Sequence, residues 1–163
     1  MNTFEPEVLA LAEALRRGGL MLATAESCTG GLIAAACTSV AGSSDWFERG
    51  IVSYSNAAKI EALGVDAALI AAHGAVSEEV ARAMAEGAVA RSRADLVVAV
   101  TGVAGPGGGT PAKPVGTVWL ATARRHGAVD AERLQLSGDR TRIRELTVQR
   151  ALQRALALAN SGR

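Results

Sequence analysis

A run of five consecutive aliphatic residues, Leu96 to Val100, constrains the fold more than any other feature of the sequence. Side chains of a strand alternate between its two faces, so an unbroken apolar run needs apolar cover on both. That arrangement is typical of a parallel strand in a sheet with helices on either side. Strand-like and helix-like segments alternate along the rest of the chain, and we predict a layered α/β/α domain with a mixed, mostly parallel sheet.

The other expected elements follow from apolar periodicity and from turn and cap residues. Strands are expected at Leu20–Ala23, Gly50–Tyr54, Thr117–Thr122 and through Leu134 and Leu136. A turn near His126 joins the last two, which are therefore antiparallel. Helices are expected at Pro6–Arg17, from Leu32 to about Gly42, after the N-cap residues Asn56, Asp66 and Ser77, and from Asp139 to about Ala159.

Composition narrows the class of protein. A length of 163 residues suits one domain spanning 1–163, and 49% hydrophobic with 20% charged residues indicates a compact globular chain. A net charge of +1 and 3% aromatic residues give no sign of a nucleic-acid partner. No apolar run could span a bilayer, and the first residues lack the pattern of a secretory signal. We therefore expect a cytoplasmic protein that does not bind a membrane.

The cysteines and histidines indicate neither a disulfide framework nor a metal site. Cys28 and Cys37 are only two, and we expect both to be reduced and buried. His73 and His126 lie far apart, with no Cys or His at the spacing of metal ligands. No metal and no cofactor are expected.

The stretch from Thr24 to Gly31 places a hydroxyl between a short apolar segment and an Ala-rich, helix-favouring one. A strand, a small turn and a helix in this order aim unpaired backbone N–H groups at whatever lies at the end of the sheet. A serine there, Ser27, could attack a carbonyl whose developing negative charge those N–H groups stabilise. The alternative is that Ser27 or Thr29 only caps the following helix.

A second group of polar residues follows the strand that is expected to end at Tyr54. Lys59 falls in the first turn of the next helix, where the helix dipole and partial burial would both lower the pKa of its amine. A neutral lysine can take a proton from serine, so Ser27 and Lys59 would make a nucleophile and base without histidine. Tyr54 could relay that proton or hold the lysine. The alternative is a solvated lysine beside a packed tyrosine.

Two further segments could bind a ligand. The glycine-rich loop from Thr101 to Thr110 follows the buried strand, at the end where α/β proteins bind ligands, but it matches neither a P-loop nor a dinucleotide fingerprint. Arg140 and Arg144 lie one helical turn apart near a helix N-terminus, where an anion such as phosphate would offset their charge. The alternatives are a flexible connection and a solvated basic face.

Together these stretches resemble the CinA C-terminal domain family, whose single-domain members are nicotinamide-nucleotide amidohydrolases. The resemblance rests on Thr24–Gly31, Gly42–Gly50, Tyr54–Lys59, Gly74–Ser77, Thr101–Pro106, Lys113–Thr117 and Gly138–Arg140. It covers nearly the whole chain in the expected order. Longer members of the family carry an additional N-terminal domain, whose activity is not transferred to this chain.

The resemblance implies hydrolysis of the carboxamide of nicotinamide mononucleotide, giving nicotinic acid mononucleotide and ammonia. Ser27 would be the nucleophile, Lys59 the general base and Tyr54 an assisting residue, and the protein is expected to be a homo-oligomer. The residues expected to bind substrate are Thr29, Gly30, Gly31, Asn56, Thr101, Gly102, Gly105, Arg140 and Arg144. Arg140 or Arg144 would hold the 5′-phosphate.

Three alternatives stay open. Cys28 is chemically the better nucleophile, but its side chain is expected to point away from that of Ser27 and to pack. A Ser-His hydrolase using His73 or His126 would be a different enzyme class, although the turn lacks a G-x-S-x-G elbow. A non-catalytic module that binds a nucleotide or a protein would share the fold.

Overall fold

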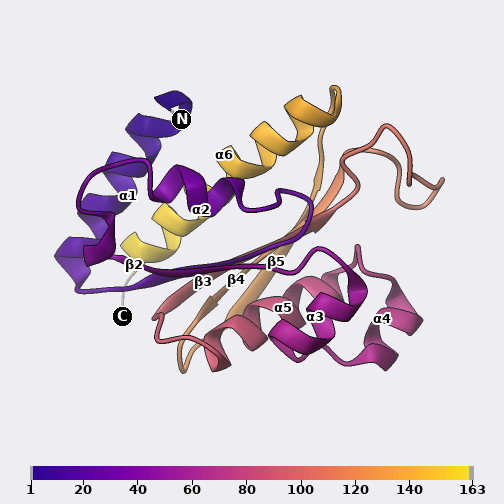
Figure 1. Cartoon of the computed structure of the whole chain (residues 1–163), viewed down its shortest axis with the longest axis horizontal. Coiled ribbons are helices and arrows are strands. Elements are labelled where there is room, and N and C mark those ends of the chain that lie inside the picture. Colours follow the sequence, from indigo (N-terminus) through magenta and orange to yellow (C-terminus); the bar gives the residue numbers. More distant parts are fainter. Residues whose placement is uncertain (1, 162–163) are drawn as a thin grey trace.

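The computed structural model describes residues 2–161 and has a five-stranded sheet between two layers of helices (Figure 1). The strands are β1 (Leu22–Glu26), β2 (Phe47–Val52), β3 (Leu96–Gly102), β4 (Thr117–Arg124) and β5 (Val129–Gln135). The helices are α1 (Glu5–Gly18), α2 (Leu32–Cys37), α3 (Asn56–Leu63), α4 (Ala67–His73), α5 (Glu78–Ala90) and α6 (Arg140–Asn160), with 3-10 turns at Asn2–Phe4 and Ser43–Asp45. The predicted α/β/α layering is confirmed.

The sheet is mixed, with strand order β2-β1-β3-β4-β5. β1 pairs in parallel with both β2 and β3, whereas the β3–β4 and β4–β5 pairs are antiparallel. β4 alone therefore runs against the other strands. The carboxyl ends of β1, β2 and β3 lie together at one edge of the sheet, the position at which open α/β sheets bind ligands.

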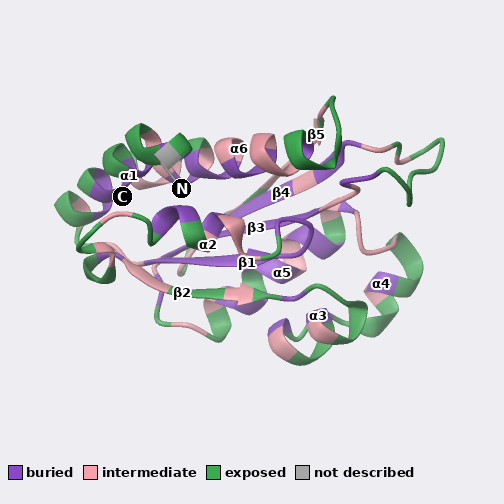
Figure 2. Cartoon of the chain, turned by 45° about the horizontal axis from the view of Figure 1, so that its top comes forward, coloured by how far each residue is buried: buried purple, intermediate pink, exposed green. Residues whose placement is uncertain are grey.

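The apolar run in β3 is covered on both faces, as its pattern requires. Leu96, Val98 and Val100 pack in the core that α1, α2 and α6 build, and Val97 and Ala99 pack in the core under α3, α4 and α5. Figure 2 shows β1 and β3 buried along their length. None of the described helices combines the length and apolar character that a bilayer-spanning segment needs.

Several predicted boundaries are wrong. β1 begins and ends later than predicted, so Thr24 to Glu26 belong to the strand and not to the turn. α2 ends at Cys37, where the N–H of Ser39 bonds to the carbonyl of Ala36 at 3.2 Å, three residues back, and the α-helical ladder stops. β2 ends at Val52, which leaves Tyr54 beyond the strand.

The helix caps are mostly as predicted. Asp66 and Ser77 accept hydrogen bonds from the first turns of α4 and α5. The cap of α3 is Ser55 and not Asn56, because the extended backbone of Ser55 lets its Oγ accept the Ala58 N–H at 3.0 Å. Asn56 is consequently the first helical residue, and its side chain is free for other contacts.

Replacing Gly87 in α5 by alanine is expected to destabilise the protein. Alanine favours a helix interior by about 1 kcal/mol over glycine, but a Cβ at this position would overlap the carbonyl oxygen of Leu63 at the end of α3. Overpacking against backbone costs about 1–3 kcal/mol, so we expect a net loss in the free energy of unfolding, measured in urea. Gly107→Ala is the control, since nothing lies near its Cβ and stability should be unchanged. A more stable Gly87→Ala protein would contradict the close contact of α3 with α5.

Candidate active site

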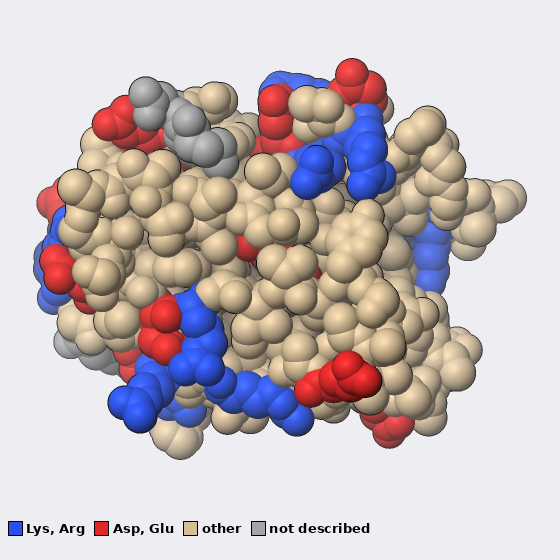
Figure 3. Space-filling view, viewed as in Figure 1, with Lys and Arg blue, Asp and Glu red and all other residues tan. Residues whose placement is uncertain are grey.

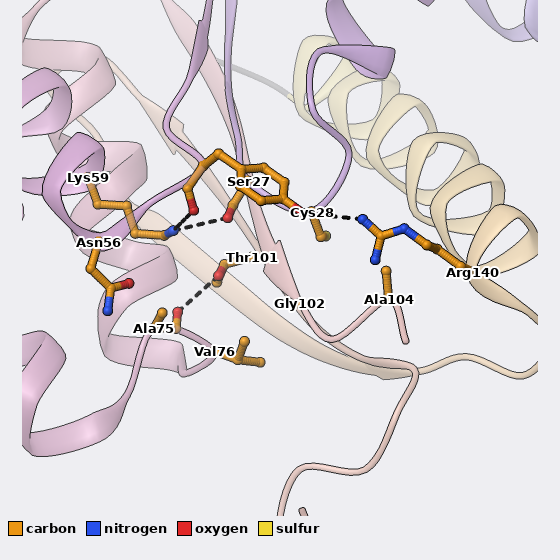
Figure 4. A pocket seen from close by; sticks show the side chains of 11 residues that line it. Ser27, Cys28, Asn56, Lys59, Ala75, Val76, Thr101, Gly102, Ala104 and Arg140 are labelled. Carbon is orange, nitrogen blue, oxygen red and sulfur yellow. Dashed lines mark hydrogen bonds between the residues drawn. The ribbon is translucent and has the colours of Figure 1, made fainter. Parts of the chain in front are cut away.

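A pocket of about 220 Å³ opens where the ends of β1, β2 and β3 meet (Figure 4). Ser27 comes from the turn after β1, Tyr54, Asn56 and Lys59 from the segment after β2, and Thr101 and Gly102 from the end of β3. The complete lining is Ser27, Cys28, Tyr54, Asn56, Lys59, Ala75, Val76, Thr101, Gly102, Ala104 and Arg140. Tertiary structure therefore brings together six of the residues predicted from separate motifs, and Arg140 with them.

Lys59 reaches Ser27 from the neighbouring helix. Its Nζ lies 3.0 Å from Ser27 Oγ and 3.0 Å from the carbonyl oxygen of Tyr54 (Figure 4). It also lies 3.1 Å from the carbonyl oxygen of Ser53. Only 2% of Lys59 and 8% of Ser27 are exposed. A neutral amine can donate its two N–H groups to the two carbonyls, which leaves its lone pair to accept the hydroxyl proton of Ser27.

The surroundings of Lys59 favour this neutral form. Burial lowers the pKa of Lys59, because the charged amine loses its hydration. Among the described residues, no carboxylate lies within ion-pairing distance of the amine to offset that loss. The predicted direction of the pKa shift agrees with this geometry, and burial is its main cause.

Tyr54 has a different contact from the one expected. Its phenol is not bonded to Lys59 or Ser27, and its hydroxyl accepts a hydrogen bond from Nη2 of Arg140 at 3.2 Å. The residue is 59% exposed. Tyr54 contacts Lys59 through its backbone carbonyl and not through its side chain. A proton relay through the phenol therefore lacks support in this arrangement, because the chain turns the ring outward after β2.

Glu26 is an important residue that the sequence reasoning missed. It is fully buried at the end of β1, and its carboxylate accepts the N–H groups of Gly31, Ile33 and Ala34 at 2.9–3.1 Å. The hydroxyls of Thr29 and Thr24 donate to it as well. Glu26 thus caps α2 from the adjacent strand. An acidic residue just before a glycine turn and a helix was the available signal, because anions favour helix N-termini.

Thr29, Gly30 and Gly31, which the sequence predicts to bind substrate, support the turn and do not line the pocket. Thr29 Oγ1 donates to Glu26 at 2.6 Å. Gly30 and Gly31 have φ of +60° and +106°, left-handed conformations that glycine adopts without strain. These glycines let the chain reverse sharply between β1 and α2, which leaves Ser27 at the end of the sheet.

The loop after β3 contributes its first residues to the pocket and its later ones to a contact with α6. Thr101 Oγ1 donates to the carbonyl of Ala75 at 2.9 Å, which ties the α4–α5 connection to the pocket. Gly105 does not line the pocket of Ser27, and its carbonyl accepts Nη1 of Arg140 at 2.9 Å. Sequence reasoning missed Ala75, Val76 and Ala104, which carry no polar side chain to mark them.

The arginines at the start of α6 have separate contacts and do not form one basic face. Arg140 lines the pocket, Arg142 pairs with Glu145 at 3.6 Å, and Arg144 donates to the carbonyls of Cys28 and Thr29. Figure 3 shows acidic side chains among the basic ones over this end of α6. Of the two arginines predicted to contact substrate, Arg140 lines the pocket of Ser27 and Arg144 does not.

Cys28 packs as predicted, but it also lines the pocket. It is buried against Ala104, Val118 and Ile143, and Figure 4 shows its sulfur near the space beside Ser27. Burial is the main cause that raises the pKa of the Cys28 thiol to about 11, so the thiol is protonated at neutral pH. Cys37, also a free thiol, lies in the core with a pKa raised by burial to about 12.

Neither histidine lies in this pocket. His73 ends α4 beside Glu79, and His126 lies in the β4–β5 turn. A Ser-His arrangement with Ser27 therefore has no support in the described residues. The same part of the chain holds no group of three or more Cys, His, Asp or Glu side chains that could bind a metal ion.

Replacing Glu26 by glutamine is expected to loosen the turn that carries Ser27. Every partner of the Glu26 carboxylate donates to it, so an amide NH₂ would face an N–H group and leave it unsatisfied. A buried unsatisfied group costs about 1–3 kcal/mol, measured as the change in the free energy of unfolding in urea. Glu61→Gln, at an exposed position in α3, is the control and should be neutral. Equal stability of the two variants would contradict the capping role.

Comparisons with known proteins agree with this architecture. A family model of the CinA C-terminal domain matches residues 6–159. A protein of Pseudomonas putida named nicotinamide-nucleotide amidohydrolase PncC is 56% identical over 148 residues, which cover 91% of this chain and 92% of that protein. The crystal structure of competence damage-inducible protein A from Klebsiella pneumoniae subsp. pneumoniae has a TM-score of 0.93 at 38% identity, covering 99% of this chain and 100% of that one.

Longer relatives match as well. A CinA-like protein of Citrifermentans bemidjiense is 58% identical over 142 residues, which cover 87% of this chain. They cover 34% of that protein, so the chain spans about a third of the length of such a relative. The match to the family model and the identity to relatives of similar length lead to one conclusion: this chain belongs to the CinA C-terminal domain family.

Proposed function

We propose that this protein hydrolyses the carboxamide of nicotinamide mononucleotide, releasing ammonia and nicotinic acid mononucleotide in pyridine nucleotide salvage. The observation that carries the proposal is the 3.0 Å contact between Lys59 Nζ and Ser27 Oγ in a pocket at the strand ends. The names of relatives such as the Pseudomonas putida protein support the choice of substrate.

In the proposed mechanism Ser27 Oγ attacks the carboxamide carbon while its proton passes to the neutral amine of Lys59. The resulting tetrahedral intermediate carries a negative oxygen. When the C–N bond breaks, Lys59 returns the proton to the leaving nitrogen, and ammonia departs. Water then attacks the acyl-Ser27 ester, again giving a proton to Lys59, which passes it back to Ser27 Oγ. The sum is one amide and one water converted to one acid and one ammonia.

The oxyanion needs N–H donors that no protein group already uses. Among the described residues, no acceptor takes the N–H of Cys28, the residue after the nucleophile, and we assign it to this role. Lys59 stays close to Ser27 because both carbonyls that hold its amine belong to the chain just after β2. The amine therefore needs little reorganisation to accept the proton.

Arg140 is our candidate for the 5′-phosphate. Its guanidinium lies at the rim of the Ser27 pocket, beside a second cavity of about 470 Å³ lined by Ala104, Pro106, Val115, Gly138, Asp139, Arg140 and Thr141. The two cavities share Ala104 and Arg140, so a mononucleotide could extend from one into the other. Tyr54, which bonds to Arg140, would then orient the arginine and not move a proton.

Loss of either member of the proposed pair should abolish most of the activity. Lys59→Met is expected to lower kcat by about 10²–10⁴-fold, because a general base contributes that much, and Ser27→Ala by at least as much. The measurement is ammonia release from nicotinamide mononucleotide. Cys28→Ala is the control and should stay within several-fold of the wild-type protein. An inactive Cys28→Ala together with an active Ser27→Ala would assign the reaction to the thiol.

The pH dependence follows from the lowered pKa of Lys59. Only the neutral amine accepts a proton, so kcat/KM should rise with pH and level off above the pKa of Lys59 in the free protein. Since burial lowers that pKa, the midpoint should fall below about 10.4, the value of an unperturbed lysine. Replacing His73 and His126 together should leave the profile unchanged. A midpoint that moves with either histidine would contradict Lys59 as the base.

A further inference from the structure

The turn that carries Ser27 has free N–H groups in a buried place. The carbonyl of Ser27 accepts the N–H of Gly30 at 3.0 Å, which closes a tight turn with Cys28 and Thr29 at its centre. Both central residues are buried, yet among the described residues no acceptor takes their N–H groups. Buried N–H groups are nearly always paired in folded proteins. The free N–H of Cys28 belongs to a residue that lines the pocket beside Ser27, which indicates a place for an anionic oxygen.

Arg144 holds this turn from outside the pocket. Its Nε donates to the carbonyl of Cys28 at 3.1 Å, and its Nη2 donates to the carbonyl of Thr29 at 3.2 Å. No carboxylate among the described residues lies within ion-pairing distance of the guanidinium. The guanidinium of Arg144 thus bonds to two neighbouring carbonyls of one turn, although Arg144 and this turn are more than a hundred residues apart in sequence.

Two hydrogen bonds together fix the backbone of Cys28: the one from Arg144 and the one between Gly30 and Ser27 inside the turn. The peptide before Cys28 is held by the Ser27–Gly30 hydrogen bond, and the peptide after it is held by Arg144. In a trans peptide the C=O and N–H groups point in opposite directions. The Ser27 carbonyl, held by Gly30, therefore sets the direction of the Cys28 N–H, and Arg144 holds the peptide on the other side of Cys28, so this residue is fixed at both of its peptides.

We propose that Arg144 is a positioning residue that holds the Ser27 turn in the conformation in which the free N–H of Cys28 serves as the oxyanion donor. The proposal rests on the proposed function, in which Ser27 is the nucleophile. Arg144 touches neither the nucleophile nor the pocket, so it acts through the two carbonyls that it holds. Glu26 supports the other end of the same segment through the N–H groups of Gly31 and α2.

The charge of Arg144 acts in the same direction as its hydrogen bonds. Although burial raises the pKa of the Cys28 thiol, the positive charge of Arg144 opposes that shift. A group that favours a negative charge on Cys28 also favours one on an oxygen bound at the same turn. A phosphate contact for Arg144 fits less well, because both carbonyl bonds would have to break and the side chain does not reach the pocket of Ser27.

The test compares Arg144→Met and Arg144→Lys with the wild-type protein, using Arg142→Ala as a control, because Arg142 lies two residues earlier in α6 and pairs with Glu145 instead of the turn. The substrates are nicotinamide mononucleotide and nicotinamide riboside, which lacks the phosphate. We expect Arg144→Met to lower kcat by about 10²-fold on both substrates with KM nearly unchanged, the effect of a misplaced catalytic group. Arg144→Lys keeps the charge but not the fork, and should fall between. Arg142→Ala should be unchanged.

A rise in KM restricted to the mononucleotide would overturn the proposal, because it would mark a phosphate contact. Wild-type kcat in Arg144→Met would overturn it too. Thermal melting shows whether a variant has lost activity because it is unfolded or because the turn is misplaced. If Arg144→Met does not fold, Arg144→Lys takes its place, and a wild-type kcat in that variant would overturn the proposal.

A second readout keeps the proposal separate from the choice of substrate. If the wild-type protein releases no ammonia from either compound, the proposed function fails, and the rate of Ser27 labelling by a fluorophosphonate decides about Arg144. In that reaction Ser27 Oγ displaces fluoride from phosphorus and the hydroxyl proton passes to Lys59, so an anionic oxygen again needs N–H donors. Labelling at least about tenfold slower in Arg144→Met than in Arg142→Ala would support the proposal. Equal rates, or an unlabelled wild-type Ser27, would overturn it.

Discussion

A lysine amine that is buried without a carboxylate beside it needs other polar atoms, and Lys59 finds them in two backbone carbonyls and one hydroxyl. The two carbonyls can take two N–H groups, which matches the neutral amine better than the charged one. The remaining lone pair faces Ser27. The same three contacts therefore supply hydrogen-bond partners for the buried amine and place it as a base for Ser27. The proposed reaction depends on this geometry.

Glu26 is the opposite case, a buried carboxylate a single residue before the nucleophile. All of its partners donate to it, and three of them are N–H groups at the start of α2. Such a carboxylate is suited to hold a helix in place and has no free position for a substrate proton. Glu26 and Lys59 thus have separate roles beside Ser27: Glu26 holds the turn, and Lys59 is available for chemistry.

The sheet brings these residues together because β1, β2 and β3 end at the same edge. A different kind of segment follows each strand at this edge: a tight turn after β1, a capped helix after β2 and a glycine-rich loop after β3. α6 then closes the arrangement through Arg140, which reaches the loop and Tyr54, and through Arg144, which reaches the turn. Relatives that are about three times as long contain the same unit as part of a larger protein.

The sequence by itself determined the layered fold, the buried strand β3 and the residues Ser27 and Lys59, because apolar periodicity and small polar turns are local patterns. Family resemblance then gave those residues their expected roles. Only the tertiary structure decided that the phenol of Tyr54 bonds to Arg140, that Thr29 and Gly31 donate to Glu26, and that Arg144 binds backbone carbonyls. Such contacts join residues far apart in the chain, and they depend on side-chain direction and loop path, which local patterns do not encode.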